Sequence, residues 1–217
     1  LPLALHIVME ICRGLAYAHE LTDADGNNLR LVHRDVSPPN ILLSRQGEVK
    51  LVDFGLAKAT SQLEHTDPGV VKGKFAYLAP EAAWGREVDH RADIFACGII
   101  LFELITGKRL FLGENDVKTV ELVRLTEVPP LAPLNSDVTS ALESIVRKSL
   151  AKEPRDRYQS CSEMAEDLAS YLFSQRLKVT GFDLRRFIER FVVEDEKGRP
   201  KEEHRPSKIE GLIEEEL

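Results

Sequence analysis

Three oxygen-bearing side chains lie close together in the first quarter of the chain, and together they could bind a divalent cation and handle a proton. Asp35 and Asn40 are separated by four residues, and Asp53 follows further along. Carboxylate and amide oxygens are the hard ligands that Mg²⁺ prefers. A carboxylate can also accept a proton from an attacking hydroxyl. The residue types and their spacing therefore indicate metal-dependent chemistry.

These residues belong to four short motifs that follow one another along the chain. In order, the motifs are His33-Arg34-Asp35, Asn40, Asp53-Phe54-Gly55 and Ala79-Pro80-Glu81. Each motif alone is weak, because an isolated Asp-Phe-Gly is usually an ordinary turn. Their order and spacing carry the information.

Two kinds of secondary structure are predicted to position the motifs. Apolar residues at helical spacing predict a helix over about residues 3–20, without a capping residue at its start. Short apolar runs at residues 41–44 and 49–52 flank a turn and predict a β-hairpin. The hairpin places Asp53 just beyond a strand end.

The rest of the chain is predicted to be mainly helical. Residues 60–78 lack a sustained period and contain Pro68, Gly69 and Gly73, which predicts a long functional loop. The apolar stretch at 92–105 is too short to span a bilayer and is typical of a buried helix. Further helical patterns cover residues 117–125, 138–150, 162–172 and 183–191.

Composition argues against several classes of protein. The 217 residues carry a formal net charge of −7, to which residues 194–217 contribute −4, so a chain that mainly coats nucleic acid or anionic lipid is not expected. Cys12, Cys97 and Cys161 stand far apart with no C-x-x-C motif, which argues against a disulfide framework or zinc site and favours a cytoplasmic location. The polar run 22–28 superficially resembles a calcium loop but lacks its glycine and its closing acid.

At its four motifs the chain resembles the eukaryotic-like (Hanks-type) serine/threonine protein kinases of bacteria, over about residues 1–172. Residues 93–98 are also similar to the family's D-x-W-S-x-G, and residues 154–157 to its P-x-x-R. The resemblance implies a mainly α fold within the α+β class: a kinase C-terminal lobe, built as a helical bundle around a buried central helix with a small β-hairpin at the active site. It also implies ATP and Mg²⁺ as cofactors, with Mn²⁺ as an alternative metal, and a protein serine or threonine hydroxyl as substrate.

The resemblance assigns roles to residues beside the reacting groups. Asp35 is expected to accept or orient the proton of the attacking hydroxyl. Asn40 and Asp53 are expected to hold the metal ion, and Leu42 is expected to pack beneath the adenine ring.

Five further residues are expected to be structural. His33 and Phe54 would stack in the hydrophobic column of the active state. Asp93 would accept hydrogen bonds from the backbone of the catalytic loop, since a buried acid requires such partners. Glu81 and Arg157 are the pair that the family joins in a buried ion bridge.

The chain departs from the family pattern at two positions. Ser37 stands where serine/threonine kinases carry a lysine that reaches the transferring phosphate, and Lys74 follows Gly73 where they carry a threonine bonded near the catalytic aspartate. One hypothesis is a reciprocal exchange, in which Lys74 places its charge near Asp35 and Ser37 supplies the hydroxyl; the flexible lysine stem permits this. The alternative is that Lys74 points to solvent and that transfer is slow or absent.

The activation segment, residues 53–81 in this resemblance, offers three hydroxyl residues for regulation before its P+1 region. Arg34 marks the subclass of kinases in which a phosphate on this segment pairs with the arginine before the catalytic aspartate. Thr66 is the first candidate for this phosphate, followed by Thr60 or Ser61, and Asp67 supplies a negative charge if the segment stays unmodified.

The nucleotide-covering half of a kinase is not recognisable in the chain. No G-x-G-x-x-G occurs, no V-A-I-K-like strand precedes the first helix, and Leu1 falls inside an amphipathic pattern. We therefore expect a piece of a longer protein that is an active serine/threonine kinase. The 217 residues alone are expected to bind ATP weakly and to transfer no phosphate.

Alternative functions remain open. A pseudokinase or signalling scaffold is favoured by Ser37 and by the missing lobe, whereas intact Asp35, Asn40 and Asp53 argue against it. A small-molecule phosphotransferase would lack the long segment that ends at residues 79–81. Tyrosine specificity is less favoured, although Ser37 weakens the usual marker against it.

The last part of the chain is predicted to form a separate extension, residues 173–217. It begins with an amphipathic helix whose apolar stripe more often docks on its own domain than on a partner. Beyond Val193 the charged composition favours a flexible acidic tail or linker. No nucleic-acid partner and no membrane segment are expected in this chain, and its oligomeric state is open.

Overall fold

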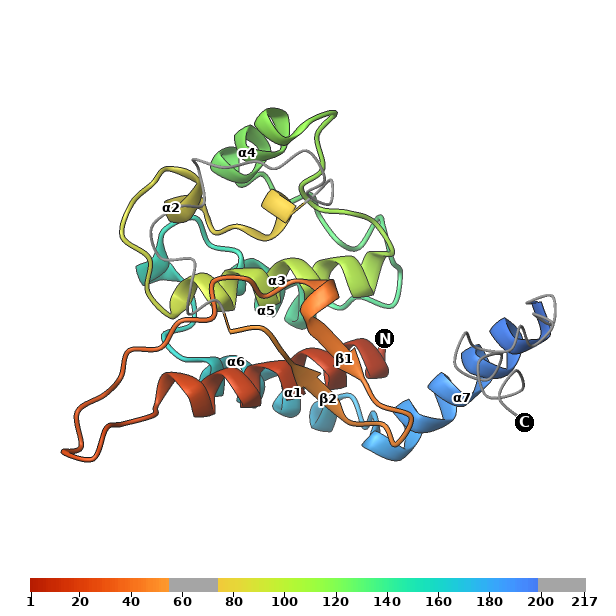
Figure 1. The fold of residues 1–217 in the computed structure, drawn as a ribbon. Helices are drawn as coiled ribbons and strands as arrows, with labels where there is room; N and C mark the ends of the chain where they lie inside the picture. Colours follow the sequence, from red (N-terminus) through yellow and green to blue (C-terminus); the bar gives the residue numbers. More distant parts are fainter. Residues whose placement is uncertain (55–73, 199–217) are drawn as a thin grey trace, which may run out of the picture.

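The computed structural model describes residues 1–54 and 74–198, with side chains for residues 1–54 and 75–191. These residues form a helical body that carries a two-stranded hairpin on one face (Figure 1). The α-helices are α1 (Pro2–His19), α2 (Pro80–Ala83), α3 (Arg91–Thr106), α4 (Asp116–Leu125), α5 (Ser140–Ser149), α6 (Cys161–Ser174) and α7 (Gly181–Gly198). Short 3₁₀ turns are η1 (Pro38–Asn40), η2 (Lys74–Tyr77) and η3 (Pro154–Asp156).

The hairpin follows the first helix and lies beside it. Strands β1 (Ile41–Leu43) and β2 (Val49–Leu51) pair antiparallel, with Leu42 opposite Lys50. Strand β2 also contacts α1. The hairpin predicted from two apolar runs is therefore present, and its second strand ends two residues before Asp53.

Helix α3 forms the centre of the body, between α1, α5 and α6. Apolar residues surround it on all sides and most of them are buried, as expected for a helix without a solvent face. Gly98 allows the close approach of α5, because a Cβ atom at this position would collide with the side chain of Ser149. The predicted mainly α bundle around one buried helix, with a small hairpin, is confirmed.

The predicted helices agree with the structure within a few residues, except for the last. Helix α7 continues to Gly198, whereas the sequence predicted a helix over 183–191 and a flexible tail beyond Val193. The Glu and Lys residues that indicated a tail are also good helix formers, so composition alone could not decide where the helix ends.

Helix α7 starts on the body and then projects away from it (Figure 1). Leu184 is fully buried in the main core and Ile188 packs against that core. Gly181 touches Gly47 of the hairpin turn, where φ is +85° and a Cβ atom would strike the Gly181 carbonyl. Within the described residues, no helix has the length and apolar character needed to cross a membrane.

Candidate active site

Asp93, near the start of the buried helix α3, holds the loop that carries Asp35. One carboxylate oxygen accepts hydrogen bonds from the backbone N–H of His33 and the ring of His19, both at 2.8 Å, and the other accepts the N–H of Arg34 at 2.9 Å. Asp93 is only 1% exposed. Three donors compensate for the burial of its charge, as a buried carboxylate requires. The backbone bonds have the geometry expected from the sequence.

His19 is the residue of this group that sequence reasoning missed. It is the last residue of α1, and its Nε2 contacts Asp93, which lies 74 positions away. Since Asp93 can only accept, Nε2 carries the proton and donates it. The one available signal was a polar ring at the end of an otherwise apolar helix, and that signal does not identify a distant partner.

His33 connects the catalytic loop to the segment after the hairpin. Its ring is fully buried, with Nε2 3.0 Å from the carbonyl oxygen of Val52 and Nδ1 accepting the N–H of Asp35 at 3.3 Å. These partners fix the neutral tautomer with its proton on Nε2. The Phe54 ring packs against His33 with centroids 4.5 Å apart. The predicted contact between His33 and Phe54 is therefore present.

The backbone is strained at two of the motif residues. Arg34 has φ +64° and Asp53 has φ +60°, a left-handed conformation that residues with a Cβ atom adopt rarely. Such strain persists only where the surroundings impose it, and it gathers at functional sites. At Arg34 the bond to Asp93 imposes it, and next to Asp53 the contacts of Val52 and Phe54 with His33 do so.

Asn40 ties together the three candidate oxygen-bearing residues. Its side-chain Nδ2 donates to the carbonyl of Asp35 at 2.7 Å, and its own carbonyl accepts the N–H of Val52 at 2.9 Å. Because Nδ2 is used in this bond, Oδ1 is the atom of the Asn40 amide that could act as a metal ligand, and Asp53 is exposed. An amide oxygen and an accessible carboxylate on adjoining segments suit a hard divalent cation. The chemistry of these donors thus fits Mg²⁺.

Of the two residues that depart from the family pattern, the structure describes the side chain of Ser37 but not that of Lys74. Ser37 is 8% exposed, and its Oγ lies 3.4 Å from the carbonyl oxygen of Asp35. The Lys74 backbone begins η2, but its side chain lies outside the described atoms. The reciprocal exchange between Ser37 and Lys74 therefore stays a prediction. Only the Ser37 hydroxyl is seen near the Asp35 backbone.

Glu81 and Arg157 form a closed, buried ion pair. Two nitrogens of Arg157 contact the two carboxylate oxygens of Glu81 at 2.8 and 2.7 Å, and the side chains are 0% and 7% exposed. The guanidinium also donates to the carbonyls of Ala151, Lys152 and Arg91. This pair links α2 to the turn η3 and to the first residue of α3, as expected for a structural role.

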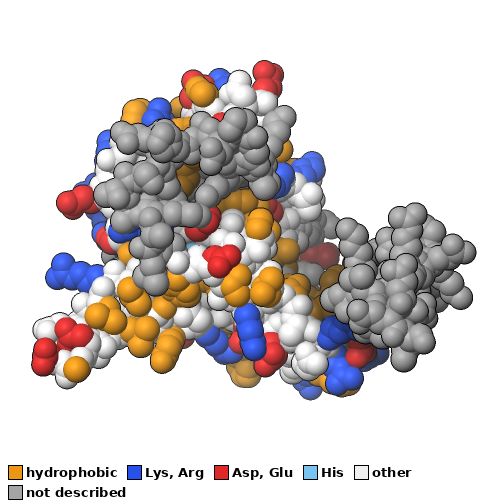
Figure 2. Space-filling view, in the orientation of Figure 1, with side chains coloured by type: hydrophobic (Ala, Val, Ile, Leu, Met, Phe, Trp, Pro, Cys, Tyr) orange, Lys and Arg blue, Asp and Glu red, His pale blue; other side chains and the backbone are white. Residues whose placement is uncertain are grey.

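An apolar surface lies at the hairpin. Leu42 is 52% exposed and Leu43 41% exposed, although both belong to β1. Figure 2 shows apolar side chains gathered across this face, over α1 and the hairpin. A groove of about 370 Å³ lies between β1 and the second half of α3; Leu43 lines it, whereas Leu42 does not. An exposed apolar surface of this kind is costly in water and is typical of a binding surface.

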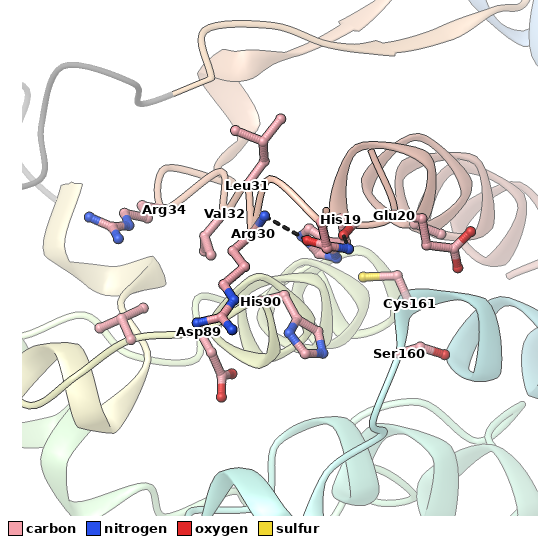
Figure 3. A pocket seen from close by; sticks show the side chains of 13 residues that line it. His19, Glu20, Arg30, Leu31, Val32, Arg34, Asp89, His90, Ser160 and Cys161 are labelled. Carbon is pink, nitrogen blue, oxygen red and sulfur yellow. Dashed lines mark hydrogen bonds between the residues drawn. The ribbon is translucent and has the colours of Figure 1, made fainter. Parts of the chain in front are cut away.

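A second cavity, of about 630 Å³, lies on the other side of the catalytic loop (Figure 3). It is lined by His19 at the end of α1, by Arg30 and Arg34, and by His90 and Cys161. The ring of His90 lies near His19, with centroids 5.4 Å apart. This cavity includes none of the candidate metal ligands.

Several predicted residues lie outside the part that the structure describes. These are Gly55 and the regulatory candidates Thr60, Ser61 and Thr66, together with Asp67. The side chain of Arg34, their predicted partner, is exposed.

Comparison with known proteins identifies a family. The family model for the protein kinase domain matches residues 3–169. Among curated proteins, the chain is 45% identical over 181 residues to the tyrosine-protein kinase MasK of Myxococcus xanthus, covering 83% of this chain and 28% of that protein. It is 38% identical over 168 residues to the serine/threonine-protein kinase PknB of Mycolicibacterium smegmatis, covering 76% and 25%.

A third relative and a solved structure agree with this assignment. The chain is 35% identical over 181 residues to the serine/threonine-protein kinase PrkC of Bacillus subtilis, covering 83% of this chain and 27% of that protein. The twitchin kinase region from C. elegans superimposes with a TM-score of 0.61 and 29% identity, over 76% of this chain and 28% of that one. The chain thus spans about a quarter of the length of the curated relatives that it matches.

Proposed function

Because the chain belongs to the protein kinase family, we propose that it forms the catalytic-loop lobe of an ATP-dependent serine/threonine protein kinase that acts in the cytoplasm on protein substrates. The observation that carries this proposal is the bonding of Asn40, which joins the loop of Asp35 to the strand that precedes Asp53. Phosphoryl transfer mainly requires groups that are positioned and charge that is neutralised, and this arrangement supplies the first requirement.

Each residue has a distinct part in the proposed reaction. The Asp35 carboxylate orients the acceptor hydroxyl and receives its proton. Asn40 and Asp53 would hold Mg²⁺, which when bound neutralises phosphate charge. Leu42 offers an exposed apolar surface for the adenine ring. We place the boundary of this lobe near residue 172, close to the end of the family match at residue 169.

Lys74 and Ser37 are proposed to share the work of the missing lysine and threonine. The position of the Ser37 hydroxyl near the Asp35 backbone supports this exchange. Replacing Lys74 with Met in the full-length protein is expected to lower autophosphorylation, because the variant removes the ammonium. Activity equal to wild type would contradict the exchange.

Thr66 is proposed as the regulatory phosphate acceptor, with Thr60 and Ser61 as secondary sites. The exposure of Arg34 supports this proposal, since a guanidinium pairs strongly with a phosphate. Mass spectrometry of active full-length protein is expected to find phosphate on Thr66. A wholly unmodified segment in active protein would contradict it.

Tyrosine specificity is the second candidate. It is favoured by the name of MasK, a tyrosine-protein kinase with 45% identity, and by Ser37 in place of the lysine typical of serine/threonine kinases. PknB and PrkC, named as serine/threonine kinases, favour the first candidate. Phosphoamino-acid analysis of the labelled product distinguishes them, because phosphoserine or phosphothreonine supports the proposal and phosphotyrosine alone contradicts it.

The proposal is tested by incubating the full-length protein that contains this chain with radiolabelled ATP, Mg²⁺ and a general protein substrate. We expect labelled protein, and loss of labelling in EDTA or in Asp53→Asn. The variant Asp25→Asn, in an exposed turn, is the matched control and should keep wild-type labelling. Absence of labelling in wild type, with ATP still bound, would favour the pseudokinase or scaffold alternative.

A further inference from the structure

Two histidine rings that are far apart in the sequence meet at the cavity beside the catalytic loop. His19 is the last residue of α1 and His90 is the residue just before α3. Both rings line the cavity of about 630 Å³ (Figure 3). Their centroids lie 5.4 Å apart, with the ring planes tilted by 59°. Neither ring binds substrate or metal in the reaction proposed above, so their contact is a separate feature of the molecule.

One nitrogen of each ring faces an oxygen atom that can only accept a hydrogen bond. Nε2 of His19 lies 2.8 Å from the Asp93 carboxylate, and Nε2 of His90 lies 2.8 Å from the backbone carbonyl of Gln159. In the neutral rings the proton is therefore on Nε2, and Nδ1 keeps its lone pair. Metal-binding histidines almost always have this arrangement, because the bond at the other nitrogen fixes the tautomer and makes the ligand more basic.

Nδ1 of His19 is a buried polar atom that the fold leaves unsatisfied. The His19 side chain is 8% exposed, and among the described residues its Nδ1 has no hydrogen-bond partner. Since nearly all buried polar atoms are satisfied, such an atom points to a bound water or ion. His90 makes no capping bond with its side chain at the start of α3, so the helix does not use its Nδ1 either.

The separation of the two rings suits one zinc ion. Zinc binds imidazole nitrogen at about 2.0–2.1 Å, which places the centroids of two rings on one tetrahedral ion about 5 Å apart. The observed centroid distance of 5.4 Å is close to this value. No group of three His, Cys, Asp or Glu side chains in the described part of the chain is arranged to hold a metal ion. Two histidines and water would therefore form the site, with weaker binding than a four-ligand structural zinc site.

The cavity gives an ion access to the rings. It is also lined by Glu20, Arg30 and Arg34, which are exposed, so the cavity opens to solvent. His90 is half-buried, so it offers an entering ion the first ligand, and His19 offers the second.

The charges around the cavity neither drive nor prevent the binding of a cation. Two carboxylates and two guanidinium groups line it, those of Glu20, Asp89, Arg30 and Arg34. Arg91 pairs with Asp89, and Asp93 bonds His19, which adds one charge of each sign. The affinity must therefore come from the imidazole nitrogens, which suit zinc better than magnesium or calcium.

We propose that His19 and His90 are the two protein ligands of a zinc-binding site, in which Nδ1 of each ring binds the ion and water completes the coordination. The ion would join the end of α1 to the start of α3, beside the Asp93 bonds that hold the catalytic loop. The site shares no ligand with the Mg²⁺ site proposed at Asn40 and Asp53, and it does not depend on the proposed kinase activity.

The test follows the histidine nitrogens of the 217-residue chain by NMR while Zn²⁺ is added in the presence of excess Mg²⁺. Proton–nitrogen correlation spectra of the imidazole rings distinguish Nδ1 from Nε2. We expect Nδ1 of His19 and Nδ1 of His90 to shift with the same binding curve, while Nε2 of both rings keeps its proton. The proposal is overturned if neither ring responds, if only one of them responds, or if Nε2 is the nitrogen that binds.

Two variants separate this site from other zinc ligands of the chain, with affinity measured by isothermal titration calorimetry. His90→Ala removes one of the two ligands and should weaken Zn²⁺ binding by more than about 10-fold, since even the loss of an outer-shell partner has that effect. Arg30→Ala changes the same cavity but removes a positive charge, so it should bind Zn²⁺ at least as tightly as wild type.

Equal affinity of a folded His90→Ala protein and wild type would overturn the proposal, and so would a loss of binding in folded Arg30→Ala that matches the loss in His90→Ala. Circular dichroism shows whether each variant is folded. If His90→Ala does not fold, the wild-type NMR titration decides the question.

Discussion

Two regions of this molecule hold their charged groups in opposite ways: the active-site face, which carries Asn40 and Asp53, and the region around the Glu81–Arg157 pair, called the base below. At the base, Glu81 and Arg157 are almost fully buried and satisfy each other through two short contacts. At the face, Asp53 is exposed and Asn40 is half-buried, on a backbone with positive φ at Asp53. A closed pair satisfies its own charges and cannot take up a ligand. Exposed polar groups on a strained backbone can still bind a ligand, provided that a buried residue holds the backbone in place.

Asp93 is the link between these two regions. It belongs to the buried helix α3, but its carboxylate bonds are made to the backbone of the loop at the face. Substitutions should therefore lower stability most at the base, less at Asp93 and least at the face. Their effect on phosphate transfer should run the other way: for each kcal/mol of lost stability, transfer should fall least at the base, more at Asp93 and most at the face.

The largest loss of stability is expected for Arg157→Met. The variant leaves the Glu81 carboxylate buried without its partner, which should lower the free energy of unfolding by about 3–5 kcal/mol. Urea denaturation followed by circular dichroism measures this. The double variant Glu81→Leu/Arg157→Met is the control and should recover most of the loss, because no lone charge remains. If Arg157→Met were as stable as wild type, the contact between Glu81 and Arg157 would not be what stabilises this region.

A smaller loss is expected for Asp93→Asn. The amide keeps the size of the side chain but offers one acceptor oxygen where two served three donors, so the free energy of unfolding should fall by about 1–3 kcal/mol. Hydrogen exchange of the His33 and Arg34 amides should also become faster, because these N–H groups lose their acceptor. The matched control is Asp167→Asn, an exposed carboxylate that accepts one bond from Tyr158. If hydrogen exchange at both amides were unchanged in Asp93→Asn, Asp93 would not be the residue that holds the backbone of the catalytic loop.

Two buried tyrosines should make the stability of the fold depend on pH. Burial, followed by the bond to Asp167, raises the pKa of Tyr158, and burial, followed by the bond to Glu103, raises that of Tyr77. A raised pKa means that folding favours the neutral phenol. The resulting stability is complete below the unfolded pKa of about 10 and is lost as the pH rises above it.

Urea denaturation between neutral pH and about pH 11 should therefore show a loss of stability at the alkaline end. Tyr158→Phe and Tyr77→Phe should each make this loss smaller, since the substituted side chain cannot ionise. A pH dependence identical to wild type in both variants would show that other groups cause the alkaline loss.

The sequence predicted the elements better than the contacts between them. The helix before the catalytic loop, the hairpin and the buried helix follow from local periodicity, which is a property of neighbouring residues. The bond between His19 and Asp93 joins positions 74 apart and depends on how α1 packs against α3. Asp93 was found because a family motif contains it, whereas a histidine at a helix end carries no such mark.

The three cysteines show the same limit. Cys12, Cys97 and Cys161 are all buried. Their spacing could not show that the helices that carry them, α1, α3 and α6, pack against one another. The end of helix α7 was predicted wrongly for another reason, because the charged residues that are common in tails are also good helix formers.

The most direct test of the account is the variant Asp35→Asn in the full-length protein, measured for phosphate transfer and for unfolding by urea. Asp35 is half-buried at the face, so the account predicts a smaller change in the free energy of unfolding than Arg157→Met causes. Transfer should fall by about 10²–10⁴-fold, because the hydroxyl loses the group that orients it and accepts its proton. Transfer at the wild-type rate by a folded Asp35→Asn protein would contradict the assignment of this loop as the catalytic centre.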